Sequence, residues 1–344
     1  MSYRFLRDLL FLLPAEVAHN VSLRGLSLAE TVGALTFFTK PNQQKNIQLM
    51  GINFPNQVGL AAGLDKNAEH ITALSRLGFG FIEVGTVTPQ PQAGNSKPRL
   101  FRLPEYNAII NRMGFNNVGV EQLIKNIESA HANIILGINI GKNAVTPIEE
   151  AANDYLSCMR QVYIHADYIT VNLSSPNTVG LRSLQLGDTI SVLLNSLKEE
   201  QHKLAQQYSR YVPLVLKIAP DLESTQITSI AKTLLACQFD GVIATNTTTS
   251  REGTNNHKLA VEKGGLSGAP LFGRSTEVVA QLSAELGSKL PIIASGGVMS
   301  GEDAVAKIRA GASLIQLYTG IIYNGPNLVY ETVNALSTVA KIEM

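Results

Sequence analysis

Residues 134–173 read IILGINIGKNAVTPIEEAANDYLSCMRQVYIHADYITVNL, and the fold of the chain can be worked out from them. An apolar run at 134–140 is followed by a helical pattern at 147–165 and by a second apolar run at 168–173. Both runs are apolar along most of their length, as is typical of parallel strands that are covered on both faces. The stretch therefore predicts a strand, a helix and a second strand.

The same alternation extends over most of the chain. Eight short apolar runs are interpreted as strands: 57–61, 81–85, 134–140, 168–173, 214–218, 241–245, 292–295 and 314–318. Helical patterns lie between most of them and after the last: 67–77, 147–165, 186–208, 223–236, 273–288, 302–310 and 327–342. Eight such units predict an α/β fold, a (β/α)8 TIM barrel over residues 41–344. A doubly wound open sheet is the alternative, but the first turn lacks its glycine-rich dinucleotide fingerprint.

Residues 1–40 are predicted to form a small helical extension before the barrel. Pro14 suits the first turn of its second helix, Gly25 the end of that helix, and Ser27 the capping box of a third. The segment holds 22 apolar residues and five of the 21 aromatic residues of the chain. It is either an ordinary helical pair packed on the barrel or an amphipathic hairpin at a membrane surface. Residues 41–46 are predicted to be a polar linker.

Composition excludes several classes of function. Charged residues make up 16% of the 344 residues, and the net charge of +1 leaves no basic excess for binding nucleic acid. The two cysteines form no disulfide framework, and the scattered histidines suggest no metal site. The sequence contains no apolar stretch long enough for a membrane-spanning helix, and Asp8 interrupts the first apolar run, which argues against a signal peptide.

The positions just past the predicted strands are where a TIM barrel builds its active site. Neutral amides are frequent there: Asn111, Asn139, Asn172, Asn177 and Asn246. An amide offers a donor and an acceptor together, which suits a ring whose edge alternates N–H and C=O groups. Lys66 and Lys217 suit an anion. The alternative is that asparagine and lysine are simply common in loops.

Three glycine-rich turns also follow predicted strands. They are 264–268 (GGLSG), Gly296-Gly297 and Thr319-Gly320. Exposed backbone N–H groups in the last two loops of a TIM barrel often bind a phosphate. Together the turns indicate a cofactor that carries a phosphate.

Five motifs carry a resemblance to a known family: 59–66 (GLAAGLDK), 111–116 (NRMGFN), 172–177 (NLSSPN), 217–221 (KIAPD) and 293–298 (IASGGV). With them the chain resembles dihydroorotate dehydrogenase over its whole length. It is most similar to the membrane-associated, quinone-using class of bacterial type. The resemblance implies oxidation of dihydroorotate to orotate in pyrimidine synthesis, with FMN as hydride acceptor and a quinone as the final acceptor. It also implies a monomer or weak homodimer, held at the cytoplasmic face of the inner membrane by residues 1–40.

The resemblance assigns roles by motif position. The residues expected to bind FMN are Ala62, Gly63, Thr86, Asn139, Asn172, Lys217, Thr245, Gly268, Gly297, Tyr318 and Thr319. Those expected to hold dihydroorotate are Lys66, Asn111, Gly114, Phe115, Asn172, Asn177, Asn246 and Thr247. Those expected at the quinone end are His19, Arg102 and Tyr318.

Ser175 is the expected base that removes the C5 proton, on a candidate lid at 174–185. A serine hydroxyl is a weak base, so it needs a relay, for which Thr178 is a candidate; the alternative for Ser175 is a turn residue before Pro176. Glu83 is interpreted as a buried partner of a cation.

A cysteine in place of Ser175 and no N-terminal extension would have indicated a soluble family member that uses fumarate or NAD. A non-catalytic FMN-binding protein of the membrane surface is the other alternative.

Overall fold

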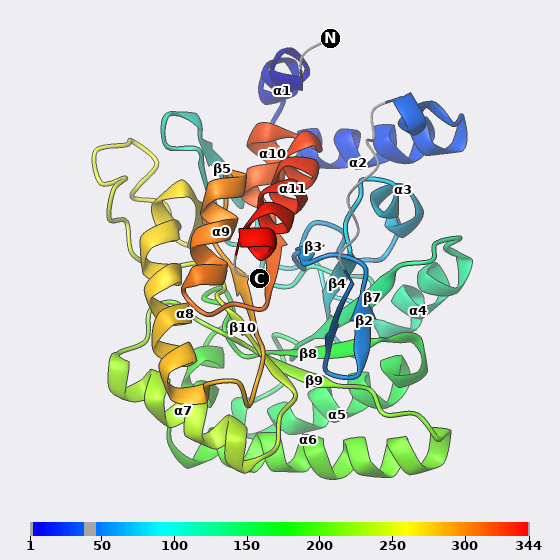
Figure 1. Ribbon diagram of the computed structural model, residues 1–344, viewed down its shortest axis with the longest axis vertical. Coiled ribbons are helices and arrows are strands. Elements are labelled where there is room, and N and C mark those ends of the chain that lie inside the picture. The colour runs from blue at the N-terminus through cyan, green and yellow to red at the C-terminus, as the bar shows by residue number, and fades with distance from the viewer. Residues whose placement is uncertain (1–2, 38–45, 343–344) are drawn as a thin grey trace.

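Eight parallel strands close into a barrel in the computed structural model of the chain, which describes residues 3–37 and 46–342 (Figure 1). In their order around the barrel the strands are β3 (Val58–Leu60), β4 (Phe81–Val87), β7 (Ile135–Ile140), β8 (Tyr168–Asn172), β9 (Leu214–Ile218), β10 (Gly241–Ala244), β12 (Ile292–Ser295) and β13 (Leu314–Leu317). The TIM barrel is confirmed, and each predicted strand lies within two residues of the observed one.

Helices surround the barrel: α3 (Ile71–Ser75), α4 (Val120–Ser129), α5 (Ala151–Val162), α6 (Gly187–Tyr208), α7 (Ser224–Ala236), α8 (Phe272–Leu286), α9 (Gly301–Arg309), α10 (Thr319–Asn324) and α11 (Asn327–Ile342). The sequence patterns did not predict α4 and α10. Their omission matters for α10, because this short helix begins directly after β13 at the barrel mouth and supports the N-terminal helices.

A hairpin closes the floor of the barrel. It consists of β1 (Ile47–Leu49) and β2 (Ile52–Phe54), which pair antiparallel. Phe54 is fully buried and packs edge-on against Phe81 of β4, with 5.3 Å between ring centroids. Phe81 contacts Tyr168 of β8 in the same way at 6.3 Å. These apolar side chains fill the end of the barrel at which the strands begin. The open end therefore lies on the opposite side, where the strands end.

A second, three-stranded sheet stands at the barrel mouth. Its antiparallel strands are β5 (Leu100–Leu103), β6 (Ala108–Asn111) and β11 (Gly265–Gly268). The pairing joins β6 to β11 although more than 150 residues separate them in the chain. This sheet, which the sequence did not predict, brings Asn111 and Gly268 to the same rim.

The N-terminal extension is a pair of helices, α1 (Tyr3–Phe11) and α2 (Ala15–Thr31), followed by a short 3-10 helix (Ala34–Phe37). The predicted stop at Gly25 and the third helix that begins at Ser27 are wrong, because α2 runs through both. The helix ends at Thr31, and Gly33, two residues further on, has a φ of 71° and donates its N–H to Glu30 O at 2.9 Å. Ser27 Oγ instead lies 2.7 Å from His70 Nδ1. The predicted domain boundary at 40/41 and most of the linker at 41–46 lie outside the described residues.

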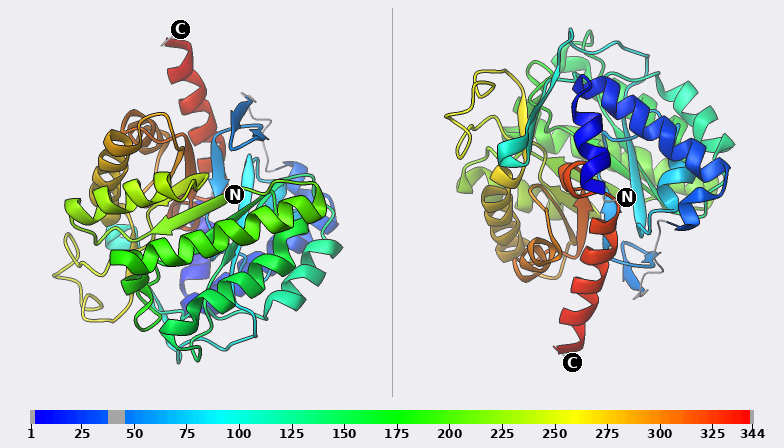
Figure 2. Two further views of the ribbon diagram at one scale, coloured as in Figure 1. Left: turned by 90° about the horizontal axis from the view of Figure 1, so that it is seen from below. Right: turned by 90° about the horizontal axis from the view of Figure 1, so that it is seen from above.

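Polar contacts fix these helices on the barrel mouth. Tyr3 OH donates to Ile322 O of α10 at 2.8 Å, and Arg7 donates to Tyr323 O at 3.2 Å. On α2, Glu16 accepts from the buried Arg99 guanidinium at 2.7 Å. Seen from above, α1 and α2 lie together across one side of the molecule (Figure 2).

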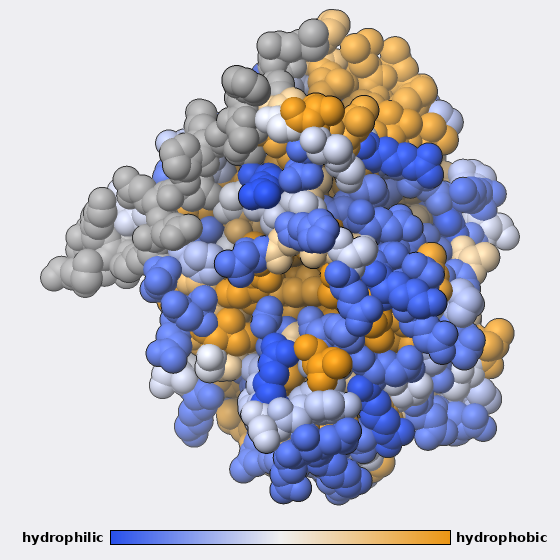
Figure 3. Space-filling model, turned by 90° about the vertical axis from the view of Figure 1, so that its right-hand side faces the viewer, coloured by the Kyte–Doolittle hydropathy of each residue, from blue (hydrophilic) through white to orange (hydrophobic). Residues whose placement is uncertain are grey.

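The outer face of this helical pair is apolar (Figure 3). Nine large apolar side chains on or beside α1 and α2 are between 37% and 82% exposed: Phe5, Leu6, Leu9, Leu12, Leu13, Val17, Val21, Leu28 and Val32. A patch of this kind marks an interaction surface more often than a solvated one. Among the described residues, no helix is both long enough and apolar enough to cross a membrane.

Close packing at the floor gives a first test. A methyl group on Gly137 of β7 would lie 2.2 Å from Tyr168 Cζ, so Gly137→Ala must displace a fully buried ring. We expect a loss of about 1–3 kcal/mol in the free energy of unfolding, measured by urea titration. Gly273→Ala is the matched control, because a methyl group there would have no atom within 4 Å apart from the backbone of its own helix and its chain neighbours. Equal stability of the two variants would contradict the packing described.

Candidate active site

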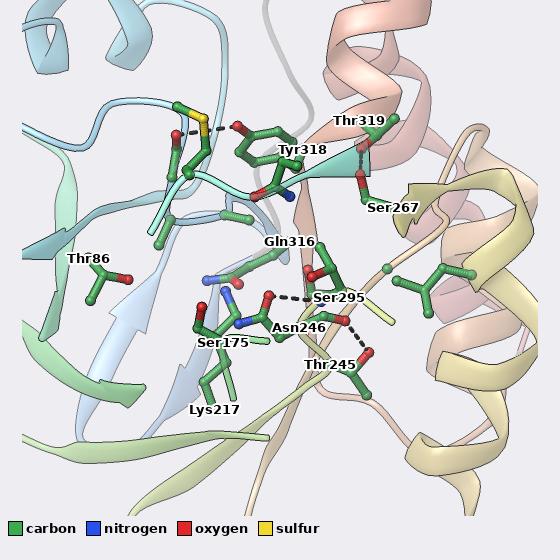
Figure 4. A pocket seen from close by; sticks show the side chains of 18 of the residues that line it. Thr86, Ser175, Lys217, Thr245, Asn246, Ser267, Ser295, Gln316, Tyr318 and Thr319 are labelled. Atoms are coloured by element: carbon green, nitrogen blue, oxygen red, sulfur yellow. Dashed lines mark hydrogen bonds between the residues drawn. The ribbon is translucent and has the colours of Figure 1, made fainter. Parts of the chain in front are cut away.

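A pocket opens at the carboxyl ends of the barrel strands and encloses about 1010 Å³ of empty space, part of it open to solvent (Figure 4). All the residues predicted to act on the substrate or to bind it line this pocket, as do all the predicted FMN contacts except Asn139. The structure thus brings together residues from the ends of seven of the eight barrel strands, all but β7, and from the β5–β6–β11 sheet. Their individual roles remain predictions.

Asn139 lies one layer below the pocket and is fully buried. Its Oδ1 accepts from Thr86 Oγ1 at 2.5 Å and from Asn172 Nδ2 at 3.2 Å, and its Nδ2 donates to Glu83 at 2.8 Å. Asn139 therefore orients two residues that line the pocket.

Glu83 of β4 is the centre of a polar layer across the barrel interior. Its carboxylate is fully buried and accepts hydrogen bonds from side chains of three other strands: Asn139 Nδ2 (2.8 Å), Tyr168 OH (3.0 Å), Thr170 Oγ1 (3.1 Å) and Gln316 Nε2 (2.7 Å). Lys217 Nζ of β9 lies 3.9 Å from Glu83 Oε1. The interpretation of Glu83 as a buried partner of a cation is confirmed.

Lys217 and Gln316 present unused polar atoms to the pocket. Burial lowers the pKa of Lys217, and the charge of Glu83 opposes that shift. The Lys217 ammonium donates no hydrogen bond to any described residue, and Gln316 Oε1 is buried without a partner among them. The sequence analysis missed Gln316, although a glutamine within the apolar run Leu314–Tyr318 was a signal. Both groups are placed to bind a polar ligand.

Lys66 follows β3 and lies at the pocket wall. Burial, together with the charge of Arg99, lowers its pKa to about 8, against the opposing effects of Glu16 and Asp65. Its ammonium forms no ion pair with the described residues. A cation of this kind favours an anionic ligand.

Ser175 lies on the loop that follows β8 and is 5% exposed. Its Oγ accepts from the backbone N–H of Asn177 at 3.2 Å, and Asn177 Nδ2 donates to Asn111 O at 3.2 Å. In the described part of the chain no hydrogen bond joins Thr178 to Ser175, and no histidine or carboxylate contacts the Ser175 hydroxyl.

Arg182 holds this loop against its neighbours. Its guanidinium donates to Ser174 O at 3.0 Å, to Thr247 O at 2.8 Å and to Asp221 Oδ2 at 2.7 Å. The sequence analysis did not single out Arg182. It fixes the backbone at Ser174, directly before Ser175, and at Thr247.

Amides and hydroxyls form a connected set beside Ser175. Asn172 Oδ1 accepts from Ser174 Oγ at 2.9 Å, and Asn246 Nδ2 donates to the same Ser174 Oγ at 3.0 Å. Asn172 Nδ2 donates to Thr86 Oγ1 at 3.0 Å. The orientation of each amide is thereby set by the protein rather than by a ligand.

The other side of the pocket is built from glycines. A methyl group on Gly297 would lie 2.4 Å from Phe272 Cα, and one on Gly268 would lie 2.2 Å from Asn107 O. Thr319 Oγ1 donates to Ser267 Oγ at 2.9 Å nearby (Figure 4). Only glycine fits these two positions, and the backbone is left open to a ligand.

The three residues predicted at the quinone end lie in different places. Tyr318 lines the pocket; its OH donates to Gly63 O at 3.3 Å, and burial raises its pKa to about 12. His19 lies on α2 outside the pocket. Burial, together with the charges of Lys66 and His70, lowers its pKa to about 4, against the opposing effect of Glu16. Arg102 lies on β5, 4.5 Å from the centre of the Phe11 ring, and binds the carbonyl groups that end α1.

Comparison with known proteins agrees with this geometry. The family model of dihydroorotate dehydrogenase matches residues 45–339. The chain belongs to the dihydroorotate dehydrogenase family.

Curated members of the family are similar to this chain over nearly its whole length. The "Dihydroorotate dehydrogenase (quinone)" of Chromobacterium violaceum is 58% identical, over 97% of this chain and 97% of that protein. The protein of the same description from Dechloromonas aromatica is 55% identical, over 99% of each. A crystal structure of the enzyme from Eimeria tenella in complex with ferulenol is 36% identical, with a TM-score of 0.85 over 95% of this chain and 92% of that one.

The polar layer gives a second test. Glu83→Leu keeps most of the side-chain volume but leaves four buried donors without their acceptor. We expect a loss of about 3–5 kcal/mol in the free energy of unfolding by urea titration. Glu83→Gln, which keeps an acceptor oxygen, should lose less. An unchanged unfolding midpoint in Glu83→Leu would show that the layer is not needed for stability.

Proposed function

We propose that this protein oxidises dihydroorotate to orotate in pyrimidine biosynthesis, with FMN as the hydride acceptor and a quinone as the final electron acceptor. The observation that carries the proposal is the composition of the pocket: two lysines, amides oriented by the protein, and a wall of glycines, all around one serine. The family membership supports the same reaction.

The residues present fit a flavin mononucleotide. Lys217 and Gln316 offer a donor and an acceptor that no described residue uses, which suits the polar edge of a flavin ring. Gly268 and Gly297 line the pocket and would present their backbone to the phosphate. The further FMN contacts proposed are Ala62, Gly63, Thr86, Asn172, Thr245, Tyr318 and Thr319, with Asn139 acting through Thr86 and Asn172. When bound, FMN would supply a two-electron acceptor, and the Lys217 cation would offset the negative charge gained on reduction.

Dihydroorotate is an anionic ring with an amide-like edge. Lys66 would bind its carboxylate, and the amides of Asn111, Asn172, Asn177 and Asn246 would pair with the N–H and C=O groups of the ring. Gly114, Phe115 and Thr247 complete the proposed substrate wall. Because hydrogen bonds within the protein already orient these amides, the substrate does not need to order them when it binds.

Ser175 is the proposed base for the C5 proton. Its hydroxyl accepts a hydrogen bond from the Asn177 N–H, and its own proton has no acceptor among the described residues. A hydroxyl is a weak base, so the proton must pass onward. Since no hydrogen bond joins Thr178 to Ser175 among the described residues, water is the simplest relay.

Residues 1–40 are proposed to serve as the membrane and quinone segment, with residues 41–344 as the FMN-binding barrel. The exposed apolar face of α1 and α2 supports a monotopic position on the cytoplasmic face of the inner membrane. The low pKa keeps His19 neutral at physiological pH, which suits contact with an uncharged quinone. Arg102 and Tyr318 are the other residues proposed there. The alternative of a soluble, fumarate- or NAD-linked enzyme does not account for this face.

Ser175→Ala tests the base. We expect it to keep flavin and dihydroorotate binding but to slow flavin reduction by about a hundredfold or more, measured by anaerobic stopped-flow absorbance. Ser183→Ala, which removes an exposed hydroxyl of the same loop, is the control and should behave like the unchanged protein. Normal reduction in Ser175→Ala would rule out the assignment.

The pKa of Lys66, about 8, predicts how substrate binding depends on pH. Below pH 8 the ammonium is charged and attracts the carboxylate; above it the amine is neutral and the attraction is lost. The KM for dihydroorotate should therefore rise about tenfold per pH unit above 8, the slope of one titrating group. In Lys66→Met the KM should be high and lack this rise. A flat profile in the unchanged protein would contradict the role of Lys66.

Deletion of residues 1–40 tests the segment. Flavin reduction by dihydroorotate should survive, because no residue of α1 or α2 lines the pocket. Turnover with a quinone should be lost, and so should binding to lipid vesicles, measured by co-sedimentation. Quinone turnover that persists after the deletion would refute this part of the proposal.

A further inference from the structure

Lys307 is a fully buried cation that the proposed reaction does not use. It lies on α9, and its ammonium donates to Ser275 Oγ at 2.5 Å and to Phe272 O at 3.3 Å. It also lies 4.9 Å from the centre of the Phe272 ring. Lys307 takes no part in the ion pairs of the described residues. A buried ammonium normally needs an anion in contact with it. Here the hydrogen-bond partners are neutral, and the nearest anion, Asp303 one turn earlier on α9, raises the pKa of Lys307 without forming an ion pair with it.

Ser275 of α8 connects this cation to the wall of the pocket. It is also fully buried, and its Oγ accepts from Lys307. The carbonyl oxygens of Leu271, Phe272 and Gly296 lie within reach of its single proton, at 2.9, 3.1 and 2.9 Å. Gly296 belongs to the glycine turn after β12, which lines the pocket, whereas Ser275 and Lys307 lie behind it.

The position of Gly296 O, 2.9 Å from Ser275 Oγ, determines the direction of the next N–H group. In a trans peptide the C=O and the N–H point to opposite sides. The C=O of Gly296 points back toward Ser275, so the N–H of Gly297 points forward into the pocket. A methyl group on Gly297 would lie 2.4 Å from Phe272 Cα, so the turn is pressed against the start of α8 in this orientation. The Gly297 N–H is thus a backbone donor directed into the pocket. The buried Lys307 ammonium lies two hydrogen bonds behind it, through Ser275.

We propose that Lys307 and Ser275 are positioning residues of an anion-binding turn, and that the anion is a phosphate monoester, the phosphate of FMN. This inference rests on the proposed function for the identity of the cofactor. Ser275 holds the Gly297 N–H toward the phosphate, and Lys307 polarises that hydrogen-bond chain and supplies charge to offset the dianion. Neither side chain has to touch the phosphate.

The chemistry of the site explains why a lysine stands here. An apolar side chain would fill the same space without the cost of burying an ammonium. Burial lowers the pKa of Lys307 to about 7, and a phosphate nearby would favour its charged form. Lys198, another buried lysine, differs in having a carboxylate partner: Asp240 lies 3.5 Å from its Nζ.

Competition between FMN and riboflavin tests the proposal, because the two differ only in the phosphate. The full-length purified protein is equilibrated with both flavins, and the ratio of bound FMN to bound riboflavin is measured by chromatography after removal of free flavin. The variants are Lys307→Met and Ser275→Ala, with Lys198→Met as the matched control. A purely structural defect would lower total bound flavin but leave the ratio unchanged.

We expect Lys307→Met to reduce the preference for FMN over riboflavin by roughly tenfold or more, the effect of losing a charge-assisted interaction. Ser275→Ala should reduce it by a few-fold, and Lys198→Met should not change it. An unchanged ratio in Lys307→Met overturns the proposal; if that variant does not fold, an unchanged ratio in Ser275→Ala overturns it. If the unchanged protein binds neither flavin, the proposed cofactor itself is wrong.

Discussion

The Glu83 carboxylate is the interaction on which the rest of the barrel interior depends. It lies in a fully buried layer, where an unpaired charge would cost several kcal/mol. Donors from β7, β8 and β13 and the ammonium of Lys217 from β9 converge on it. The carboxylate therefore links five of the eight strands through side chains, in addition to the backbone ladder. Below this layer the core is apolar around Phe54; above it lies the pocket.

The same layer determines what the pocket offers to a ligand. Asn139 and Gln316 each use one amide end on Glu83, so their other ends are oriented upward. The free end of Asn139 accepts hydrogen bonds from Thr86 and Asn172 and so orients them, whereas the Gln316 oxygen has no partner among the described residues. The carboxylate of Glu83 lies below the pocket, and in the described part of the chain no carboxylate lines the pocket itself. The pocket is therefore neutral or positive. That balance suits an anionic substrate and a cofactor that gains electrons.

The eight barrel strands were predictable because each is a short apolar run set between helical patterns. The amides, lysines and glycine turns of the pocket were predictable for a related reason, since strand ends meet at one edge. The assignment of single residues to FMN, to the substrate and to the base came from the resemblance to the family. The β5–β6–β11 sheet was not predictable, because it pairs Asn111 with Gly265 across the chain and no local period records such a partner. Gly25 has the composition of a helix stop, yet α2 continues through it to Thr31, and the positive φ is adopted by Gly33 instead.

The burial of Lys307 could not be predicted from the sequence, for a different reason. A lysine in an amphipathic helix has the pattern of a solvated residue, and only the packing of α8 and of the Gly296 turn around it reveals its burial. The N-terminal helices show the reverse. Their apolar excess was evident from composition, but it was the fold that separated the residues held on α10 from those left exposed. Burial of a charge and exposure of an apolar face are both properties of the assembled chain.

The most direct test of this account is a two-step spectroscopic experiment on the purified protein without oxygen. Dihydroorotate is added first, and the flavin absorbance is followed; a quinone, fumarate and NAD⁺ are then added to separate samples. The account predicts that dihydroorotate bleaches the yellow colour and that only the quinone restores it. A flavin that dihydroorotate leaves oxidised, or a reduced flavin that fumarate or NAD⁺ reoxidises while the quinone does not, would contradict it.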